Sequence, residues 1–453
     1  MGNITLEQAA QWCGGRVEEK YREVAFCGAN IDSRKILPGQ LFVALEGVRD
    51  GHEFIPMAME NGASAVLCKH CQADIPAIIV EDPRIALGKI AGGYRQQLDM
   101  KVVGVTGSVG KSTTKEMIAA VLQEDFVVSK TPANYNNDLG MPMAILAMPE
   151  NTQIAVLEMG MNHFGEIAYL TGIAQPDVAV IVNIGTMHIE HLGSREGILQ
   201  AKLEILEGLK PNGKAFFNGD DDMLWGAREK LNCRVAYFGN NNFRFDLRAR
   251  VLAGELGRLA FQVATEEEVF AVELPLEGEH YIPDALAAVS VGLHFGVAPQ
   301  QIRKQLASFQ NMEGRQEIFG AKGYTIIKDC YNAGPESMAA ALQVLKHRAG
   351  RRIAVLGDML ELGVRAAEEH EKVGALAASC ADVLLSYGPN REHMMAGAVA
   401  AGMDREHIGL FDSRDAMADS LRENCREGDV LLFKGSHGMH MELVLEKFLN
   451  EER

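Results

Sequence analysis

The segment Lys101 to Lys115, KVVGVTGSVGKSTTK, carries residue types that can grip the phosphates of a nucleotide. A short apolar run leads into a glycine-rich turn, and a helix-like run follows. The N–H groups of such a turn can close on phosphate oxygens, while a lysine supplies positive charge and a serine hydroxyl can hold Mg²⁺. We therefore predict a site for ATP or GTP formed by Gly107, Ser108, Val109, Gly110, Lys111, Ser112 and Thr113.

The spacing of this loop is shorter than the usual G-x-x-x-x-G-K-[ST] pattern, because the residue five before Gly110 is Val105. It fits a T-G-x-x-G-K-S variant. The alternative is an ordinary glycine-rich turn between a strand and a helix. The order of strand, glycines, lysine and hydroxyls favours the phosphate site.

Two further polar residues follow apolar runs that resemble buried parallel strands. Glu158 ends the run IAVLE, and His188 lies just after VAVIVNIG. The carboxyl ends of parallel strands meet at one edge of a sheet, so these side chains are expected near the phosphate loop. Glu158 can hold Mg²⁺ opposite Ser112, and His188 can contact metal or substrate. A capping glutamate and a structural histidine are the alternatives, and His191 is interpreted as structural.

Lys202 lies in REGILQAKLEILEGL, a segment with helical spacing of apolar residues. It is three or four positions from several of them, so it is predicted to point into the apolar stripe. Burial lowers the pKa of a lysine, and a neutral amine can react with CO₂ to give a carbamate, which is an anionic metal ligand. From periodicity alone, a lysine that extends along the helix edge to solvent is favoured.

Several polar residues lie where the elements of a nucleotide enzyme meet. The turn ANYNNDLGMP contains Asn136 and Asn137, which could line a polar ligand, or the segment could simply be a loop. Arg315 lies at a predicted domain junction, and Asp329 ends the strand-like run YTIIKD. Together these two residues could close on a nucleotide from a third domain.

The composition excludes several classes of protein. The 453 residues are 47% hydrophobic and 23% charged, with a formal net charge of −17, which argues against a surface that coats nucleic acid or anionic membranes. No run approaches the ~18 apolar residues of a membrane span, and the N-terminus has no signal-peptide pattern. We expect a cytoplasmic protein without a nucleic-acid partner.

The alternation of strand-like and helix-like segments predicts an α/β protein of three domains. Residues 1–98 form a small α/β unit, residues 99–314 a central doubly wound parallel sheet with the phosphate loop, and residues 315–453 a second, Rossmann-like α/β series. Residues 243–251, FRFDLRARV, alternate apolar and polar and predict an antiparallel insertion in the central domain.

Several motifs in order along the chain resemble the ATP-dependent Mur ligases of bacterial peptidoglycan synthesis. They include IDSRKILPGQLFVALEGVRDGHEFI, TGSVGKSTTKE, YNNDLGMP, EMGMNHFGEI and AKLEI. DCYNAGPESMAAAL, LGDMLELG and LLFKGSHGMHMELVLE are similar to the branch that adds D-alanyl-D-alanine. The resemblance runs essentially end to end and implies the three-domain Mur ligase architecture.

The resemblance also implies roles for matching residues. Lys111 would contact the ATP phosphates, Ser112 and Glu158 would hold Mg²⁺, and His188 would hold a second Mg²⁺. Lys202 matches a lysine that is carbamylated in the family. The resemblance therefore favours a buried, carbamylated lysine over one that extends to solvent. Arg315 and Asp329 would contact ATP. The uridine nucleotide would bind at the D-S-R segment, with Ser33 and Arg34, and Asn136 and Asn137 would contact substrate.

The implied reaction joins D-alanyl-D-alanine to UDP-N-acetylmuramoyl-tripeptide, using ATP and Mg²⁺, through an acyl phosphate. The tripeptide carboxylate attacks the γ-phosphate, and the dipeptide amine then displaces phosphate. Closure of three domains would exclude water from the acyl phosphate. We expect a monomer, although no pattern in the sequence fixes the oligomeric state.

One motif departs from the family pattern. The family usually has G-x-H-N-x-x-N-A-L-A-A, whereas this chain has GEHYIPDALAA, so Tyr281 and Asp284 stand where asparagines are usual. An ionised aspartate cannot donate a hydrogen bond as an amide does. The departure bears on nucleotide affinity or preference. A folylpolyglutamate-synthase-like ligase and a non-catalytic nucleotide-binding regulator are the alternative functions, and the D-S-R and DGHEF segments argue against the first.

Overall fold

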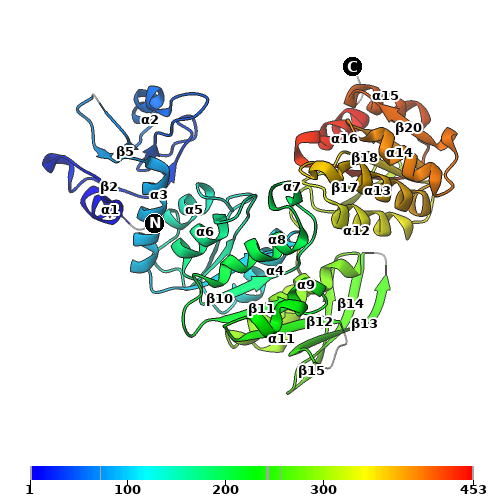
Figure 1. Ribbon diagram of the computed structural model, residues 1–453, viewed down its shortest axis with the longest axis horizontal. Coiled ribbons are helices and arrows are strands. Elements are labelled where there is room, and N and C mark those ends of the chain that lie inside the picture. The colour runs from blue at the N-terminus through cyan, green and yellow to red at the C-terminus, as the bar shows by residue number, and fades with distance from the viewer. Residues whose placement is uncertain (1–2, 72, 241–243, 256, 451–453) are drawn as a thin grey trace.

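The computed structural model describes residues 3–71, 73–240, 244–255 and 257–450. Three α/β units follow one another along the chain, and Figure 1 shows the N-terminal and C-terminal units at opposite ends of the central one. This is the predicted three-domain α/β architecture. Within the described ranges, no helix has both the length and the apolar character that crossing a membrane requires.

The N-terminal unit is built on a small parallel sheet with the strand order β3-β4-β5-β6, beside a short antiparallel pair of β1 and β2. Asp82 caps its longest helix by accepting hydrogen bonds from two first-turn amides, and Pro83 begins that helix. Its elements are β1 Ile4–Thr5, α1 Leu6–Cys13, η1 Glu19–Tyr21, β2 Ala25–Phe26, β3 Ala29–Asn30, β4 Leu41–Val43, η2 Gly51–Phe54, α2 Ile55–Glu60, β5 Ala65–Cys68, β6 Ala77–Ile79 and α3 Pro83–Gln97.

The central unit contains, among described residues, a nine-stranded sheet in the order β15-β14-β13-β12-β11-β10-β7-β9-β8. The strands are parallel from β8 to β13, while β14 and β15 extend the edge in antiparallel fashion.

The strands of this sheet are β7 Lys101–Thr106, β8 Val128–Lys130, β9 Ile154–Glu158, β10 Val178–Ile181, β11 Lys214–Asn218, β12 Val235–Asn240, β13 Leu247–Glu255, β14 Arg258–Ala264 and β15 Val269–Leu274. The helices of the unit are α4 Lys111–Leu122, α5 Gly140–Leu146, α6 Glu166–Ala174, α7 Ile189–Leu192, α8 Arg195–Leu203, η3 Glu204–Leu206, α9 Asp222–Ala227, η4 Arg228–Lys230, η5 Glu279–Tyr281, α10 Ile282–His294 and α11 Pro299–Ala307.

The C-terminal unit has a six-stranded sheet over the described residues, in the order β16-β17-β21-β18-β19-β20, with only the β16–β17 pair antiparallel. Its elements are β16 Glu317–Ala321, β17 Tyr324–Asp329, α12 Pro335–Lys346, β18 Arg352–Gly357, η6 Gly363–Arg365, α13 Ala366–Cys380, β19 Val383–Tyr387, α14 Arg391–Ala400, η7 Arg405–His407, β20 Ile408–Phe411, α15 Arg414–Asn424, β21 Val430–Lys434, η8 His437–Met439 and α16 Met441–Leu449.

Apolar side chains on both faces of the central sheet explain why its strands are nearly continuous apolar runs. One face packs on α4 and α10, and the other packs on α3, α5 and α6, so that the N-terminal unit shares a core with the central one. Polar links reinforce this contact, since Tyr94 Oη donates to Met148 O at 2.9 Å and Arg95 Nε donates to Ala174 O at 2.7 Å. The N-terminal unit is therefore held firmly against the central sheet.

The predicted strands and helices around the phosphate loop are present, and the antiparallel insertion is confirmed in its described part as β13 to β15. Several elements were not predicted, among them the helices α1, α5, α6, α9 and α11 and the strands β1, β2, β3, β8, β11, β12, β16 and β20. Most of these strands are short or lie at a sheet edge, where one exposed face interrupts the apolar pattern.

Candidate active site

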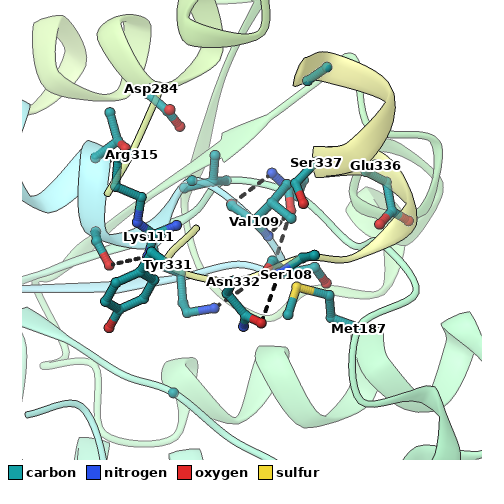
Figure 2. Close-up of a pocket in the computed structure, with 18 of the residues that line it drawn as sticks. Ser108, Val109, Lys111, Met187, Asp284, Arg315, Tyr331, Asn332, Glu336 and Ser337 are labelled. Carbon is teal, nitrogen blue, oxygen red and sulfur yellow. Dashed lines mark hydrogen bonds between the residues drawn. The ribbon is translucent and has the colours of Figure 1, made fainter. Parts of the chain in front are cut away.

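A cavity of about 510 Å³ lies between the carboxyl ends of the central strands and the C-terminal unit. Figure 2 shows part of its lining, with residues of both units facing one space. Among the predicted site residues, those that line it are Ser108, Val109, Gly110, Lys111, Ser112, Thr113, Asn136, Asn137, Glu158, His188, Asp284, Arg315 and Asp329. The structure thus brings together residues that are more than 200 positions apart in the sequence.

The phosphate loop connects β7 to α4 and is held in shape by the neighbouring strand end. Asn183 Oδ1 accepts hydrogen bonds from the N–H groups of Ser108 at 3.0 Å and Val109 at 2.9 Å. Gly110 has φ +82° at the N-terminus of α4, and a Cβ there would lie 2.5 Å from Asp284 Oδ1. Both the positive φ and this close approach require glycine, which explains the glycine that the sequence places before Lys111.

Lys111 and Arg315 supply positive charge at the N-terminus of α4. Lys111 Nζ donates to the carbonyls of Gly107 at 2.8 Å and Ser108 at 3.2 Å. Burial lowers the pKa of Lys111, and the charge of Glu158 opposes that effect. The Arg315 guanidinium lies 4.0 Å from the centre of the Tyr331 ring, a cation–π contact.

Arg315 also reaches the helix that follows the phosphate loop, because its Nη2 donates to Ser112 Oγ at 3.3 Å. Its Nε is buried and has no hydrogen-bond partner. An anion that entered here would find an unsatisfied donor beside the N-terminus of α4. The geometry therefore suits a phosphate chain that lies between Lys111 and Arg315.

Glu158 ends β9 and has only 2% of its surface exposed. Asn136 Nδ2 donates to its Oε1 at 2.8 Å, while Oε2 is buried without a hydrogen-bond partner and lies 3.8 Å from Lys115 Nζ. Lys115 is itself fully buried and donates to Thr131 O at 2.7 Å. A fixed carboxylate with one free oxygen, in the cavity that Ser112 also lines, fits a divalent cation.

His188 contacts the C-terminal unit. Its Nδ1 lies 2.5 Å from Glu361 Oε2, and the two residues have φ +63° and +62°. His188 holds the Glu361 carboxylate at a lowered pKa through this bond. In this arrangement one imidazole nitrogen is engaged across the unit boundary, which leaves Nε2 as the nitrogen that could hold a ligand.

Lys202 is buried near the end of α8, with 2% of its surface exposed. The interpretation that it extends to solvent is therefore wrong, and the predicted inward orientation is confirmed. Burial, assisted by the positive charge of Lys111, lowers the pKa of Lys202 well below its usual value. Lys202 is not among the residues that line the cavity, although it lies close enough to feel the charge of Lys111.

Asp284 and Tyr281, the departures in the GEHYIPDALAA motif, are both buried beside the phosphate loop. Thr114 Oγ1 donates to Asp284 Oδ1 at 2.8 Å, and burial raises the pKa of Asp284 to about 8. The Tyr281 hydroxyl accepts a hydrogen bond from Asn311 Nδ2 at 2.9 Å, and burial raises its pKa. Asp284 is therefore mostly protonated at neutral pH.

Asp329 ends β17 and forms a buried ion pair on the C-terminal side of the cavity. Lys434 Nζ donates to Asp329 Oδ2 at 2.6 Å and to Asn332 O at 2.9 Å. Asp329 Oδ1 accepts from the N–H of Gln316 at 3.2 Å, directly beside Arg315. The ion pair joins β17 to β21, and the bond from Gln316 ties the junction segment to Asp329.

Comparisons with known proteins cover the three units separately. Residues 26–95 match the model of the Mur ligase family, catalytic domain, residues 105–292 match the Mur ligase middle domain, and residues 314–437 match the Mur ligase, glutamate ligase domain. A UDP-N-acetylmuramoyl-tripeptide–D-alanyl-D-alanine ligase of Bacillus subtilis is 38% identical over 98% of both chains. The chain belongs to the Mur ligase family.

Solved structures of this family show the same fold. A crystal structure of MurF from Acinetobacter baumannii has a TM-score of 0.91 with 32% identity and covers 100% of both chains. A MurF ligase from Thermotoga maritima, crystallised in complex with ADP, has a TM-score of 0.82 and 32% identity over 93% of this chain and 97% of that chain. The likeness extends over all three units, as the order of motifs predicted.

The D-S-R segment lies apart from the cavity, in the N-terminal unit of this Mur ligase. Arg34 Nη2 donates to Asp32 Oδ2 at 2.8 Å, and its side chain is 77% exposed. This guanidinium holds the pKa of Asp32 at about 2. Ser33 is buried, and its carbonyl accepts from Asn61 Nδ2 at 2.9 Å. Arg34 is thus the predicted substrate residue of this segment that is open to a ligand.

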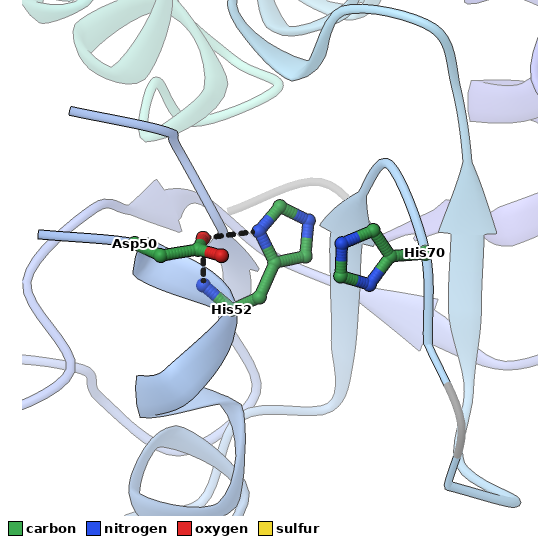
Figure 3. A group of neighbouring side chains, drawn as sticks. All are labelled: Asp50, His52 and His70. Atoms are coloured by element: carbon green, nitrogen blue, oxygen red, sulfur yellow. Dashed lines mark hydrogen bonds and ion pairs between the residues drawn. The ribbon is translucent and has the colours of Figure 1, made fainter.

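The N-terminal unit also brings together Asp50, His52 and His70, whose possible ligand atoms lie within 4.8 Å of one another (Figure 3). His52 Nδ1 is 2.6 Å from Asp50 Oδ1, and its Nε2 accepts from the N–H of Lys69 at 3.1 Å. Both ring nitrogens of His52 are therefore engaged within the protein. The geometry indicates that His52 stabilises the loop after β5 through hydrogen bonds and does not favour a metal site.

Sequence reasoning missed several residues of the site. Lys115 follows Lys111 by four positions, so it lies on the same face of α4, and that spacing was the available signal. No pattern in the sequence marks Thr114 as a residue of the site. Glu336 and Glu361 reach the central unit from the C-terminal one, and only the packing of the units places them there.

Proposed function

We propose that this protein is an ATP-dependent ligase that joins D-alanyl-D-alanine to UDP-N-acetylmuramoyl-tripeptide and forms UDP-N-acetylmuramoyl-pentapeptide in peptidoglycan synthesis. The single observation that carries the proposal is the shared cavity, in which a phosphate loop and an unpartnered carboxylate oxygen face the C-terminal unit. The end-to-end likeness to ligases of that name supports it.

ATP binds with its phosphate chain at the N-terminus of α4 in this proposal. Lys111 and Arg315 neutralise phosphate charge from two sides, which their positions beside Ser112 support. Asp284 and Asp329 face the nucleotide from the central and C-terminal units. The relative crystallised with ADP supports the choice of an adenine nucleotide. The nucleotide residues are those predicted, Gly107, Ser108, Val109, Gly110, Lys111, Ser112, Thr113, Asp284, Arg315 and Asp329.

Ser112 and Glu158 would hold one Mg²⁺, and His188 with a carbamylated Lys202 would hold a second. The free Oε2 of Glu158 and the lowered pKa of Lys202 are the observations that favour this set. A divalent cation there supplies charge neutralisation between the substrate carboxylate and the γ-phosphate. Asn136 donates a hydrogen bond to Glu158 and so fixes the orientation of the carboxylate that would bind the metal. Asn137 lines the cavity beside Asn136.

The reaction proceeds in two steps. A carboxylate oxygen of the tripeptide attacks the γ-phosphorus of ATP, which releases ADP and leaves an acyl phosphate. Lys111 and Arg315 stabilise the charge that develops on the transferring group. The dipeptide amine then attacks the acyl carbon, the C–O bond to phosphate breaks, and an amide forms. Because water would hydrolyse the acyl phosphate, the C-terminal unit closes over the cavity.

The uridine nucleotide lies on the N-terminal unit near Ser33 and Arg34, where the exposed guanidinium suits a diphosphate. Domain boundaries at 98/99 and 314/315 separate the three binding units. The protein acts in the cytoplasm in this proposal, because its substrates are nucleotides and soluble peptides, and we propose that it acts as a monomer.

Mass spectrometry of the product tests the proposal. The purified protein is incubated with ATP, Mg²⁺, D-alanyl-D-alanine and either the meso-diaminopimelate or the lysine form of the UDP-tripeptide. We expect one of the two to yield the UDP-pentapeptide. Failure of both tripeptides, combined with tight ADP binding, would instead favour a non-catalytic nucleotide-binding regulator.

A further inference from the structure

Two glutamates that line the cavity each have one carboxylate oxygen that is buried without a hydrogen-bond partner in the part of the chain that the structure describes. The two oxygens are Glu158 Oε2 and Glu336 Oε2. An unpartnered buried anion is costly, so such an oxygen indicates a missing cation or donor. The metal assigned to Glu158 accounts for the first oxygen and leaves the second without a role.

Glu336 is held rigidly by one of its oxygens. It is the second residue of α12, and its Oε1 accepts from both the N–H of Thr186 at 2.8 Å and the Thr186 hydroxyl at 3.0 Å. Oε2 therefore has a fixed direction and has no hydrogen-bond donor of its own among the described residues.

The surroundings of Oε2 distinguish between two kinds of cation. Cβ atoms at Gly185 and Gly334 would lie 3.1 and 4.0 Å from it, and the Met187 side chain packs on Gly334. A hard divalent ion requires several oxygen ligands, which these neighbours do not provide. An ammonium group is satisfied by a single carboxylate partner, so Oε2 suits an ammonium better than a divalent ion.

The location of Glu336 within the cavity suits the second substrate rather than the nucleotide. In Figure 2, Glu336 lies on the opposite side of the phosphate loop from Asp284 and Arg315. It also belongs to the C-terminal unit, which has to close for the second step. We propose that Glu336 binds the ammonium group of the incoming amino substrate through Oε2 and accepts one of its protons, so that the free amine is positioned toward the acyl phosphate.

This inference rests on the proposed function, because it requires an amino substrate and an acyl phosphate. The test is Glu336→Gln, which preserves the shape of the side chain and removes its charge. The variant is expected to raise the KM for D-alanyl-D-alanine by about 10- to 100-fold, as for the loss of a charged hydrogen bond. The urea midpoint shows whether the fold is retained.

Hydroxylamine provides the second measurement. It is uncharged at neutral pH and traps acyl phosphates as hydroxamates, so it reports the first step without requiring an ammonium site. Glu336→Gln is expected to form hydroxamate at the unmodified rate. A loss of hydroxamate as large as the loss of ligase activity would overturn the inference. A shift in the Mg²⁺ concentration for half-maximal hydroxamate formation would also overturn it, because Glu336 would then be a metal ligand.

Thr186→Val is the matched control, because it removes a donor to Oε1 and leaves Oε2 untouched. It is expected to keep the KM for D-alanyl-D-alanine within about twofold. An increase equal to that of Glu336→Gln would mean that Glu336 only joins the two units, which overturns the inference. Absence of hydroxamate in the unmodified protein would overturn the proposed function itself, and this inference with it.

Discussion

The Thr114 hydroxyl donates a hydrogen bond to Asp284 Oδ1 at 2.8 Å, directly beneath the phosphate loop. Asp284 occupies the position where the family usually has asparagine, and burial raises its pKa to about 8. A protonated carboxyl combines a donor and an acceptor, as an amide does. Near neutral pH, Asp284 can therefore present the same hydrogen-bonding pattern as the usual asparagine.

Replacement of Asp284 by asparagine should change how stability depends on pH. The folded protein keeps the proton of Asp284 up to about pH 8, whereas the unfolded chain loses it near 3.8. The free energy of unfolding therefore falls between these pH values, by up to about 1.4 kcal/mol per pH unit from this group. Urea denaturation measures the free energy of unfolding of both proteins at pH 5.5 and at pH 8.5. The value for Asp284→Asn minus that for the unmodified protein should be larger at pH 8.5. An equal difference at both pH values would contradict this assignment.

Lys111→Ala should remove most ligase activity while leaving the fold intact. The ammonium is the charge that the loop brings to the transferring phosphate, and loss of one such group typically lowers kcat by about 10²- to 10³-fold. Steady-state kinetics measure the loss, and calorimetry should show weaker ADP binding. Lys20→Ala, which alters an exposed pair with Asp74, serves as the control and should retain full activity. Normal turnover in Lys111→Ala would be incompatible with the proposed phosphate site.

Lys202→Ala should abolish turnover, because the buried amine would be lost together with its carbamate. Carbon-13 NMR with labelled bicarbonate should show a carbamate signal in the unmodified protein that the variant lacks. A short carboxylic acid such as propionate should restore part of the activity by supplying the missing anion. Full activity of Lys202→Ala without any added acid would rule out the carbamate.

Glu361→Gln should make the second metal site harder to fill, because the carboxylate at Nδ1 fixes the His188 ring and raises the basicity of the free Nε2. The Glu361 carboxylate engages His188 at 2.5 Å and is itself 46% exposed, so the pair is worth only about 0.2–1 kcal/mol. The Mg²⁺ concentration for half-maximal rate should therefore rise by roughly 1.5- to 5-fold. Glu368→Gln, an exposed pair with Lys372 nearby in the chain, should leave this concentration unchanged. A lower Mg²⁺ requirement in Glu361→Gln would show instead that the pair competes with the metal.

The parallel strands and the phosphate loop could be predicted because their signals are local. The run before Gly107 is apolar, as a strand buried on both faces must be, and the loop residues are adjacent in the sequence. The inward orientation of Lys202 also followed from helical spacing. Periodicity could not reveal the extent of its burial, because that depends on what packs against α8.

Contacts between units were beyond the reach of the sequence. Glu336 reaches Thr186 across 150 positions, and Glu361 reaches His188 across 173. Neither glutamate differs in its local pattern from a solvated one. Asn136 shows the same limit, since an amide cluster predicted a ligand contact while the structure shows a hydrogen bond to Glu158.

Phosphate release from ATP across a matrix of substrates tests the central proposal most directly. The account predicts rapid release only when a UDP-N-acetylmuramoyl-tripeptide and D-alanyl-D-alanine are both present, with one phosphate released for each amide bond formed. Equal release with a free amino acid and a shorter UDP-peptide would contradict it and would indicate a ligase that acts at an earlier step.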